Sequence, residues 1–219
     1  MPDAVLVSDF DGTMTAEDFY SLAVKRLLPA EALGPWKAYL AGRMTHFNAL
    51  RTIFSRIRAP EADVLAVIDA MGLDPKLPDA LTRLRAAGWE VVVASAGCAW
   101  YIDRLLDTAG VCLEVHANPG VYLPGGPLVM EAPPPSPFTC EETGVDKAAV
   151  VRDALARARA VAFAGDGLAD LPAALLVPDG RRFARGDLAE ALTRCGRPFR
   201  TFAAWSDIAA MLLDAGGAS

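Results

Sequence analysis

Two carboxylates close to the start of the sequence, Asp9 and Asp11, have the types and spacing of a reactive acidic pair. They follow the apolar run 5–7, which is typical of a buried strand. Alternate side chains of an extended chain share a face, so both carboxylates can project into one crevice if the strand geometry persists past Asp9. Like charges this close favour a bound cation or a shared proton. An ordinary acidic turn at Gly12 is the alternative.

A second acidic pair follows a later apolar run. Asp166 and Asp170 come directly after residues 160–164, a run that predicts another buried strand. In parallel sheets the ligand crevice lies beyond the carboxyl ends of the strands, so this pair can meet Asp9 and Asp11 in space. Acidic groups gathered there would repel one another without a cation, and their oxygens suit Mg²⁺. The predicted metal ligands are Asp9, Asp11 and Asp166, in a site where the carboxylates of Asp9 and Asp166 are completed by a backbone carbonyl and waters.

Other residues have the chemistry of an anion site. Ser95 and Ala96 follow the β-branched run 89–94, and we expect them in a loop at the start of a helix, where the macrodipole favours an anion. Lys147 falls in the first turn of a predicted helix, where the dipole disfavours a cation, so a compensating anion is expected. Small residues after a strand and a solvated lysine are the alternatives. With the carboxylates, these groups indicate phosphoryl transfer.

The elements that must position these groups alternate between helix and strand from residue 78 onward, which predicts a doubly wound parallel α/β sheet. Residues 15–75 instead show four amphipathic helical segments in succession. We therefore predict a core domain of residues 1–14 and 76–219 and a helical cap domain of residues 15–75 that covers the strand ends. Segment 118–140 is rich in proline and predicts a hairpin followed by an extended connector.

Composition limits the possible partners. Hydrophobic residues make up 53% of the 219 residues and charged residues 22%, which is typical of a globular protein. The net charge of −6, with scattered Lys and Arg, argues against a nucleic acid or an anionic membrane as partner. With no visible signal peptide and no apolar run long enough to span a bilayer, we expect a cytoplasmic protein. The cysteines form no C-x-x-C pair, so free thiols are expected at Cys98, Cys112, Cys140 and Cys195.

The motifs, in their order along the chain, resemble those of the haloacid dehalogenase superfamily of phosphatases. The matching segments are Asp9-Phe10-Asp11-Gly12-Thr13, Ser95, Lys147 and Gly165-Asp166-Gly167-x-x-Asp170. The helical block after the first motif is similar to that superfamily's first type of cap. Within the superfamily the chain looks most similar to the phosphoserine-phosphatase-like branch, in particular to methionine-salvage phosphatases and phosphoethanolamine/phosphocholine phosphatases.

This resemblance implies roles for the predicted residues. Asp9 would attack phosphorus, and Asp11 would protonate the leaving alkoxide and then activate water against the aspartyl-phosphate. Asp170 would orient the site from behind the metal ligands, and the substrate would be a small phosphorylated metabolite. Asp18, nine residues after Asp9, would either contact the substrate from the cap or cap its own helix. A phosphomutase that uses the same intermediate and a non-catalytic phospho-ligand-binding module are the alternative functions.

Overall fold

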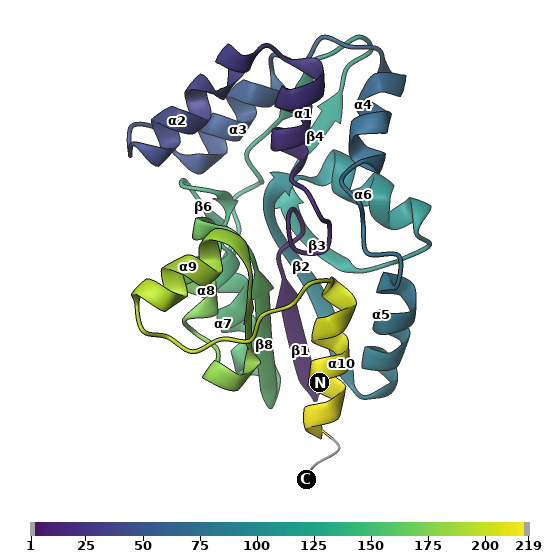
Figure 1. Ribbon diagram of the computed structural model, residues 1–219, viewed down its shortest axis with the longest axis vertical. Coiled ribbons are helices and arrows are strands. Elements are labelled where there is room, and N and C mark those ends of the chain that lie inside the picture. The colour runs from purple at the N-terminus through teal and green to yellow at the C-terminus, as the bar shows by residue number, and fades with distance from the viewer. Residues whose placement is uncertain (1–2, 217–219) are drawn as a thin grey trace.

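The computed structural model describes residues 3–216, and a five-stranded sheet lies at its centre (Figure 1). The sheet contains β1 (Ala4–Ser8), β2 (Trp89–Cys98), β3 (Glu114–Asn118), β8 (Ala160–Gly165) and β9 (Arg182–Ala184). Its order is β3-β2-β1-β8-β9, and every neighbouring pair is parallel. The predicted parallel α/β fold is therefore confirmed, with the strand that precedes Asp9 in the middle of the sheet.

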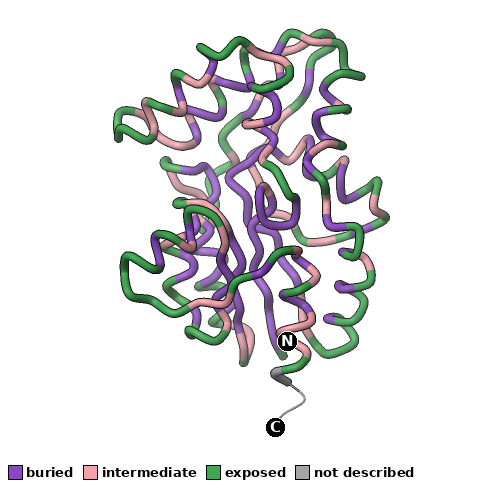
Figure 2. Tube along the Cα trace, viewed as in Figure 1, coloured by how far each residue is buried: buried purple, intermediate pink, exposed green. Residues whose placement is uncertain are grey.

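Helices cover both faces of this sheet. One face packs against α5 (Leu77–Ala86), α6 (Ala99–Thr108) and α10 (Trp205–Gly216), and the other against α7 (Lys147–Arg157), α8 (Leu171–Ala174) and α9 (Gly186–Arg194). Strand β1 shows why: Leu6 belongs to the first core and Val5 and Val7 to the second, as the alternation of a strand requires. All five residues of β1 are buried, and Figure 2 shows the strands in the middle of the sheet mostly in the colour of buried residues.

Four helices lie beyond the carboxyl end of the sheet, at the top of Figure 1. They are α1 (Phe19–Leu27), α2 (Gly34–Leu40), α3 (His46–Phe54) and α4 (Glu61–Asp69), with the short 3₁₀ helix η1 (Ala30–Leu33) between the first two. These match the four predicted helical segments, and we refer to α1–α4 as the cap. The division of the chain into a core domain and a cap domain at residues 15 and 75 stays a prediction.

Two hairpins from the second half of the chain contact the cap. Strands β4 (Gly120–Tyr122) and β5 (Leu128–Met130) form the predicted hairpin, and the Tyr122 hydroxyl donates a hydrogen bond to the carbonyl of Ala59. The β6 (Thr139–Cys140) to β7 (Gly144–Val145) hairpin presents Glu142 to the start of α3, whose first two backbone N–H groups it accepts at 3.1 and 2.9 Å. These hydrogen bonds connect the cap to the hairpins, in addition to the two chain segments that lead into and out of the cap.

Strand β2 is longer than the sequence predicted. It continues through Ser95 and Ala96 to Cys98, with a register shift against β3 between Ala94 and Cys98. The prediction that Ser95 and Ala96 lie in a loop at a helix N-terminus is therefore wrong, because pairing of Cys98 with Asn118 extends the strand up to α6.

The short 3₁₀ helices η2 (Leu168–Asp170) and η3 (Asp179–Arg181) precede α8 and β9. The four cysteines are free thiols. Within the described residues, none of the helices has both the length and the apolar character needed to span a membrane.

Candidate active site

Asp9 is the first residue after β1, and the backbone holds it firmly. Its N–H donates to the carbonyl of Ala164 at 2.9 Å, which continues the pairing with β8, and its carbonyl accepts the Ser8 hydroxyl at 2.7 Å. The Trp205 indole N–H donates in turn to the Ser8 hydroxyl at 2.9 Å. The Asp9 side chain is 9% exposed, and its carboxylate accepts the N–H of Phe10 at 2.7 Å. Buried hydrogen bonds to its N–H, its carbonyl and its carboxylate therefore set the position of Asp9.

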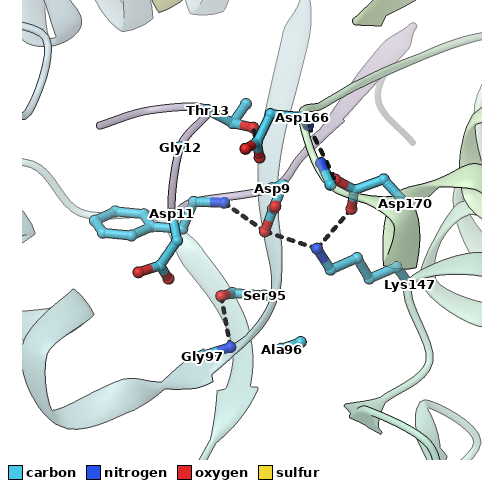
Figure 3. A network of polar contacts seen from close by, with 12 residues as sticks. Asp9, Asp11, Gly12, Thr13, Ser95, Ala96, Gly97, Lys147, Asp166 and Asp170 are labelled. Atoms are coloured by element: carbon cyan, nitrogen blue, oxygen red, sulfur yellow. Dashed lines mark hydrogen bonds and ion pairs between the residues drawn. The ribbon is translucent and has the colours of Figure 1, made fainter. Parts of the chain in front are cut away.

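Lys147 lies between two carboxylates (Figure 3). Its Nζ is 2.8 Å from Oδ1 of Asp9 and 2.6 Å from Oδ1 of Asp170, and all three side chains are buried. It is the first residue of α7, as predicted, and Asp146 caps that helix by accepting the Ala149 N–H. Burial alone would lower the pKa of Lys147, but Asp170 and Asp9 outweigh burial and raise it. The expected compensating anion is thus supplied by the protein, and Lys147 stays an ammonium.

Three carboxylates form a compact acidic group. Asp9, Asp166 and Asp170 each offer one oxygen, and these oxygens lie within 4.8 Å of one another. The Thr13 hydroxyl donates to Asp166 at 3.0 Å, and Asp170 accepts the N–H groups of Asp166 and Gly167 at 3.0 and 2.9 Å. Burial and then repulsion from Asp170 raise the pKa of Asp9 well above its usual value and that of Asp166 to about 7. Close, mutually repelling oxygen donors fit a divalent cation. Asp170, predicted to stand behind the ligands, belongs to this group.

Asp11 as a metal ligand, in a site that a backbone carbonyl and waters complete, stays a prediction. The Asp11 carboxylate itself is not part of the acidic group. It turns away from Asp9 (Figure 3) and accepts the Phe19 N–H at 3.0 Å and the Tyr101 hydroxyl at 2.8 Å. The strand ends at Ser8, and Gly12 adopts φ +64°, so the two-residue alternation does not reach Asp11. Burial raises the pKa of Asp11, and the two donors partly offset this effect. Tyr101, which the sequence did not single out as a site residue, therefore belongs to the site.

Ser95 faces the same region from β2. Its side chain is 1% exposed, and its Oγ accepts the N–H of Gly97 at 3.0 Å. The Ala96 carbonyl accepts the side-chain amide of Asn118 at 2.7 Å. A Cβ on Gly97 would lie 2.0 Å from the Tyr101 hydroxyl oxygen and 2.6 Å from Oδ2 of Asp11, so only glycine fits here. This stretch of β2 therefore positions Asp11 as well as offering the Ser95 hydroxyl.

A cavity of about 270 Å³ joins these groups to the cap. Its wall contains every predicted site residue: Asp9, Asp11, Asp18, Ser95, Ala96, Lys147, Asp166 and Asp170. Asp18 occupies the N-cap position of α1, but its carboxylate makes no capping hydrogen bond, which favours the alternative that it faces a ligand. Burial and then repulsion from Asp11 raise the pKa of Asp18 to about 7. His46 also lines the cavity, and burial and the nearby Lys147 lower its pKa to about 4.

The model of the haloacid dehalogenase-like hydrolase family matches residues 6–175 of the chain, which is more than half of its 219 residues. The chain therefore belongs to this family of hydrolases, and the family predicted from the motifs is confirmed. The matched range includes all four motif segments and the cap. A search of curated protein sequences finds no match.

Solved structures share this fold. The chain is similar to a haloacid dehalogenase family hydrolase from Salmonella enterica subsp. enterica serovar Typhi, with a TM-score of 0.70 and 18% identity over 92% of this chain and 67% of that one. A probable phosphoserine phosphatase from Vibrio cholerae gives a TM-score of 0.68 and 20% identity over 98% and 66%. Phosphoserine phosphatase from T. onnurineus gives 0.64 and 16% over 96% and 94%. The chain spans about two thirds of the length of the first two, and identities this low show the fold alone.

Proposed function

We propose that this protein is a Mg²⁺-dependent phosphatase that hydrolyses a phosphomonoester of a small metabolite through an aspartyl-phosphate on Asp9. The observation that carries the proposal is the arrangement of Asp9 itself. Its buried carboxylate lies at a cavity wall, 2.8 Å from the Lys147 ammonium and within the acidic group, with its orientation fixed by the Phe10 N–H. Membership of the hydrolase family and the phosphoserine phosphatases among the structural neighbours support the same reaction.

In this proposal Asp11 carries the proton. Burial raises its pKa, which favours the protonated form that gives a proton to the leaving alkoxide. The resulting carboxylate then takes a proton from the water that attacks the aspartyl-phosphate. The Tyr101 hydroxyl and the Phe19 N–H hold this carboxylate in place. Its direction away from the acidic group leaves it free of metal and on the cavity side where a leaving group would stand.

The residues that would hold Mg²⁺ are Asp9, Asp166 and Asp170, whose carboxylates each offer one oxygen within 4.8 Å of the other two. When bound, the cation neutralises the repulsion between the attacking carboxylate and the phosphate dianion. Lys147, which keeps its proton beside Asp9, and the Ser95 hydroxyl would bind the oxygens of the transferred phosphoryl group. The chain thus supplies the nucleophile and the proton carrier from one segment, the phosphate donors from two more, and Asp166 and Asp170 from a fourth.

The test is release of inorganic phosphate from a panel of phosphorylated metabolites, with Mg²⁺ and after chelation. We expect turnover with Mg²⁺ and little with EDTA or with Ca²⁺, whose looser coordination fits the site poorly. The variant Asp9→Asn should abolish turnover because an amide cannot form the acyl phosphate. Asp153→Asn, which changes an exposed carboxylate on α7, is the matched control and should retain activity. Full turnover without a divalent cation, or in Asp9→Asn, would refute the proposal, and transfer of phosphate to a second metabolite instead of water would identify a mutase.

A further inference from the structure

The part of the cavity wall that the cap contributes is aromatic. Tyr20 and Trp36 stack with ring centroids 4.1 Å apart, and Trp36 lies 5.1 Å from Tyr39 and 5.4 Å from His46. Tyr39 and His46 complete the set with an edge-to-face contact at 5.1 Å. These four residues, which we call the aromatic wall, come from α1, α2 and α3, and all of them line the cavity. Aromatic rings that keep an accessible surface beside a reactive site offer apolar faces to a ligand.

Among the described residues, no unpaired cationic side chain lines the same cavity to bind a negatively charged leaving group. Within residues 3–216, Lys147 is the only Lys or Arg that lines it, and Lys147 is already bound to Asp9 and Asp170. His46 is neutral at physiological pH because its pKa is lowered to about 4. Two further acidic side chains, Asp18 and Asp187, line the cavity instead. The cap arginines lie outside the lining, at Arg26, Arg43, Arg51, Arg56 and Arg58.

These two observations limit the leaving group. A carboxylate on it would lose water on entering the cavity, would find no unengaged cation and would approach further carboxylates. An apolar or aromatic group would instead cover the rings of the aromatic wall. We propose that the aromatic wall is the leaving-group subsite, and that it selects phosphomonoesters whose leaving group presents an apolar face and carries no carboxylate.

This inference rests on the proposed phosphatase function and narrows it. Several structures that share the fold are those of phosphoserine phosphatases, and the leaving group of phosphoserine contains a carboxylate. The cavity of this chain disfavours that substrate in spite of the shared fold. Specificity in such a site depends on which groups are left unpaired by the wrong ligand, and here the unpaired group is the substrate's own carboxylate.

Two matched substrate pairs test the inference with the Mg²⁺-loaded protein. Phosphoserine is phosphoethanolamine with a carboxylate added, so their comparison isolates that charge. Benzyl phosphate and ethyl phosphate both release alcohols, so their comparison isolates the aromatic face. We expect kcat/KM for phosphoserine to be at least about tenfold below that for phosphoethanolamine, and kcat/KM for benzyl phosphate to be roughly three- to tenfold above that for ethyl phosphate.

A variant links the preference to the wall. Trp36→Ala should lower kcat/KM for benzyl phosphate far more than kcat/KM for ethyl phosphate, and so remove most of the preference, because one ring contact with the leaving group is lost. The exposed neighbour Lys37→Ala, on the same helix α2, is the control and should leave both values unchanged. Tyr39→Leu, a half-buried member of the wall, is a second variant should Trp36→Ala fold poorly.

The outcomes separate this inference from the phosphatase proposal. Phosphoserine hydrolysed as well as phosphoethanolamine would overturn the inference while the phosphatase proposal stands. An equal loss on both aromatic and aliphatic esters in Trp36→Ala would do the same. If none of the four esters is hydrolysed, the phosphatase proposal fails for this class of compound. Calorimetric titration of the Mg²⁺-loaded protein with the same esters then tests the subsite alone, and affinities in the reverse order would overturn it.

Discussion

Replacing Tyr101 by phenylalanine tests the assignment of Asp11 as the proton carrier. The change removes the single hydroxyl that donates to Oδ2 of Asp11 at 2.8 Å and keeps the ring, which stacks on Phe19 with centroids 4.5 Å apart. Burial raises the pKa of Tyr101 well above its usual value, so the hydroxyl is a permanent donor. A buried hydrogen bond to a charged group contributes about 1.5–3 kcal/mol, which corresponds to a loss in kcat of roughly 10- to 100-fold.

The sign of the pH effect gives a second measurement. The Tyr101 hydrogen bond lowers the pKa of Asp11, so its removal raises that pKa further. Asp11 must be ionised to accept the proton of water, and the acidic limb of the kcat–pH profile should therefore move to higher pH in Tyr101→Phe. The assay is steady-state phosphate release across pH 4–9 at a temperature where both proteins remain folded.

A simple loss of packing would give a different result. It would lower the melting temperature and leave the shape of the pH profile unchanged. The control is Tyr122→Phe, which removes a hydroxyl that donates to the Ala59 carbonyl. Tyr122 does not line the cavity. A kcat within about twofold of the wild type together with an unshifted acidic limb in Tyr101→Phe would refute the role given to Asp11.

Two further predictions follow from the charges of the site. Asp18 and Asp166 both have pKa values raised to about 7 by burial, so the folded state holds more protons than the unfolded state, and metal-free protein should lose stability as the pH rises from about 4 to about 7. His46 makes one opposing contribution because its pKa is lowered to about 4. Thermal melts should show this decline in stability in the metal-free protein and a weaker decline with Mg²⁺. A rise in the stability of the metal-free protein over this pH range would contradict the raised pKa values of Asp18 and Asp166. Asp18→Ala should lower kcat/KM for the preferred metabolite more than tenfold, about 1.4 kcal/mol, and change hydrolysis of p-nitrophenyl phosphate much less. An equal loss on both substrates would argue against recognition by Asp18.

The sequence predicted the fold and most of the site because both depend on local patterns. Buried runs that end in polar residues identify the strands, and the rule that parallel strands end at one edge places Asp9 near Asp166 and Asp170 without further information. Lys147 was predicted to need an anion because of its place at a helix start, and the structure supplies two. The helical periodicity of residues 15–75 likewise predicted four cap helices.

The remaining features depend on contacts that no local pattern contains. Asp11 points away from the acidic group because β1 ends at Ser8, so the alternation of side chains along a strand does not extend to Asp9 and Asp11. Tyr101 meets Asp11 across 90 residues of sequence, so only the folded chain brings them together. Ser95 was placed in a loop because small residues interrupt the β-branched run, whereas tertiary pairing with β3 prolongs the strand. For the same reason the sequence predicts the hairpin of β4 and β5 but not the hairpin of β6 and β7, nor the contacts of either hairpin with the cap.

The hydrogen bond from Trp205 to Ser8 has a consequence for synthesis of the chain. The two residues are 197 positions apart, and Ser8 passes the contact on to the backbone carbonyl of Asp9. The surroundings of Asp9 are therefore incomplete until the segment that contains α10 has left the ribosome, well after Asp9 itself has emerged. During translation at about 5–20 residues per second, the nascent protein would spend roughly ten seconds or more without this support for Asp9. This support for Asp9 is thus completed only after Trp205 has been synthesised and has packed against Ser8.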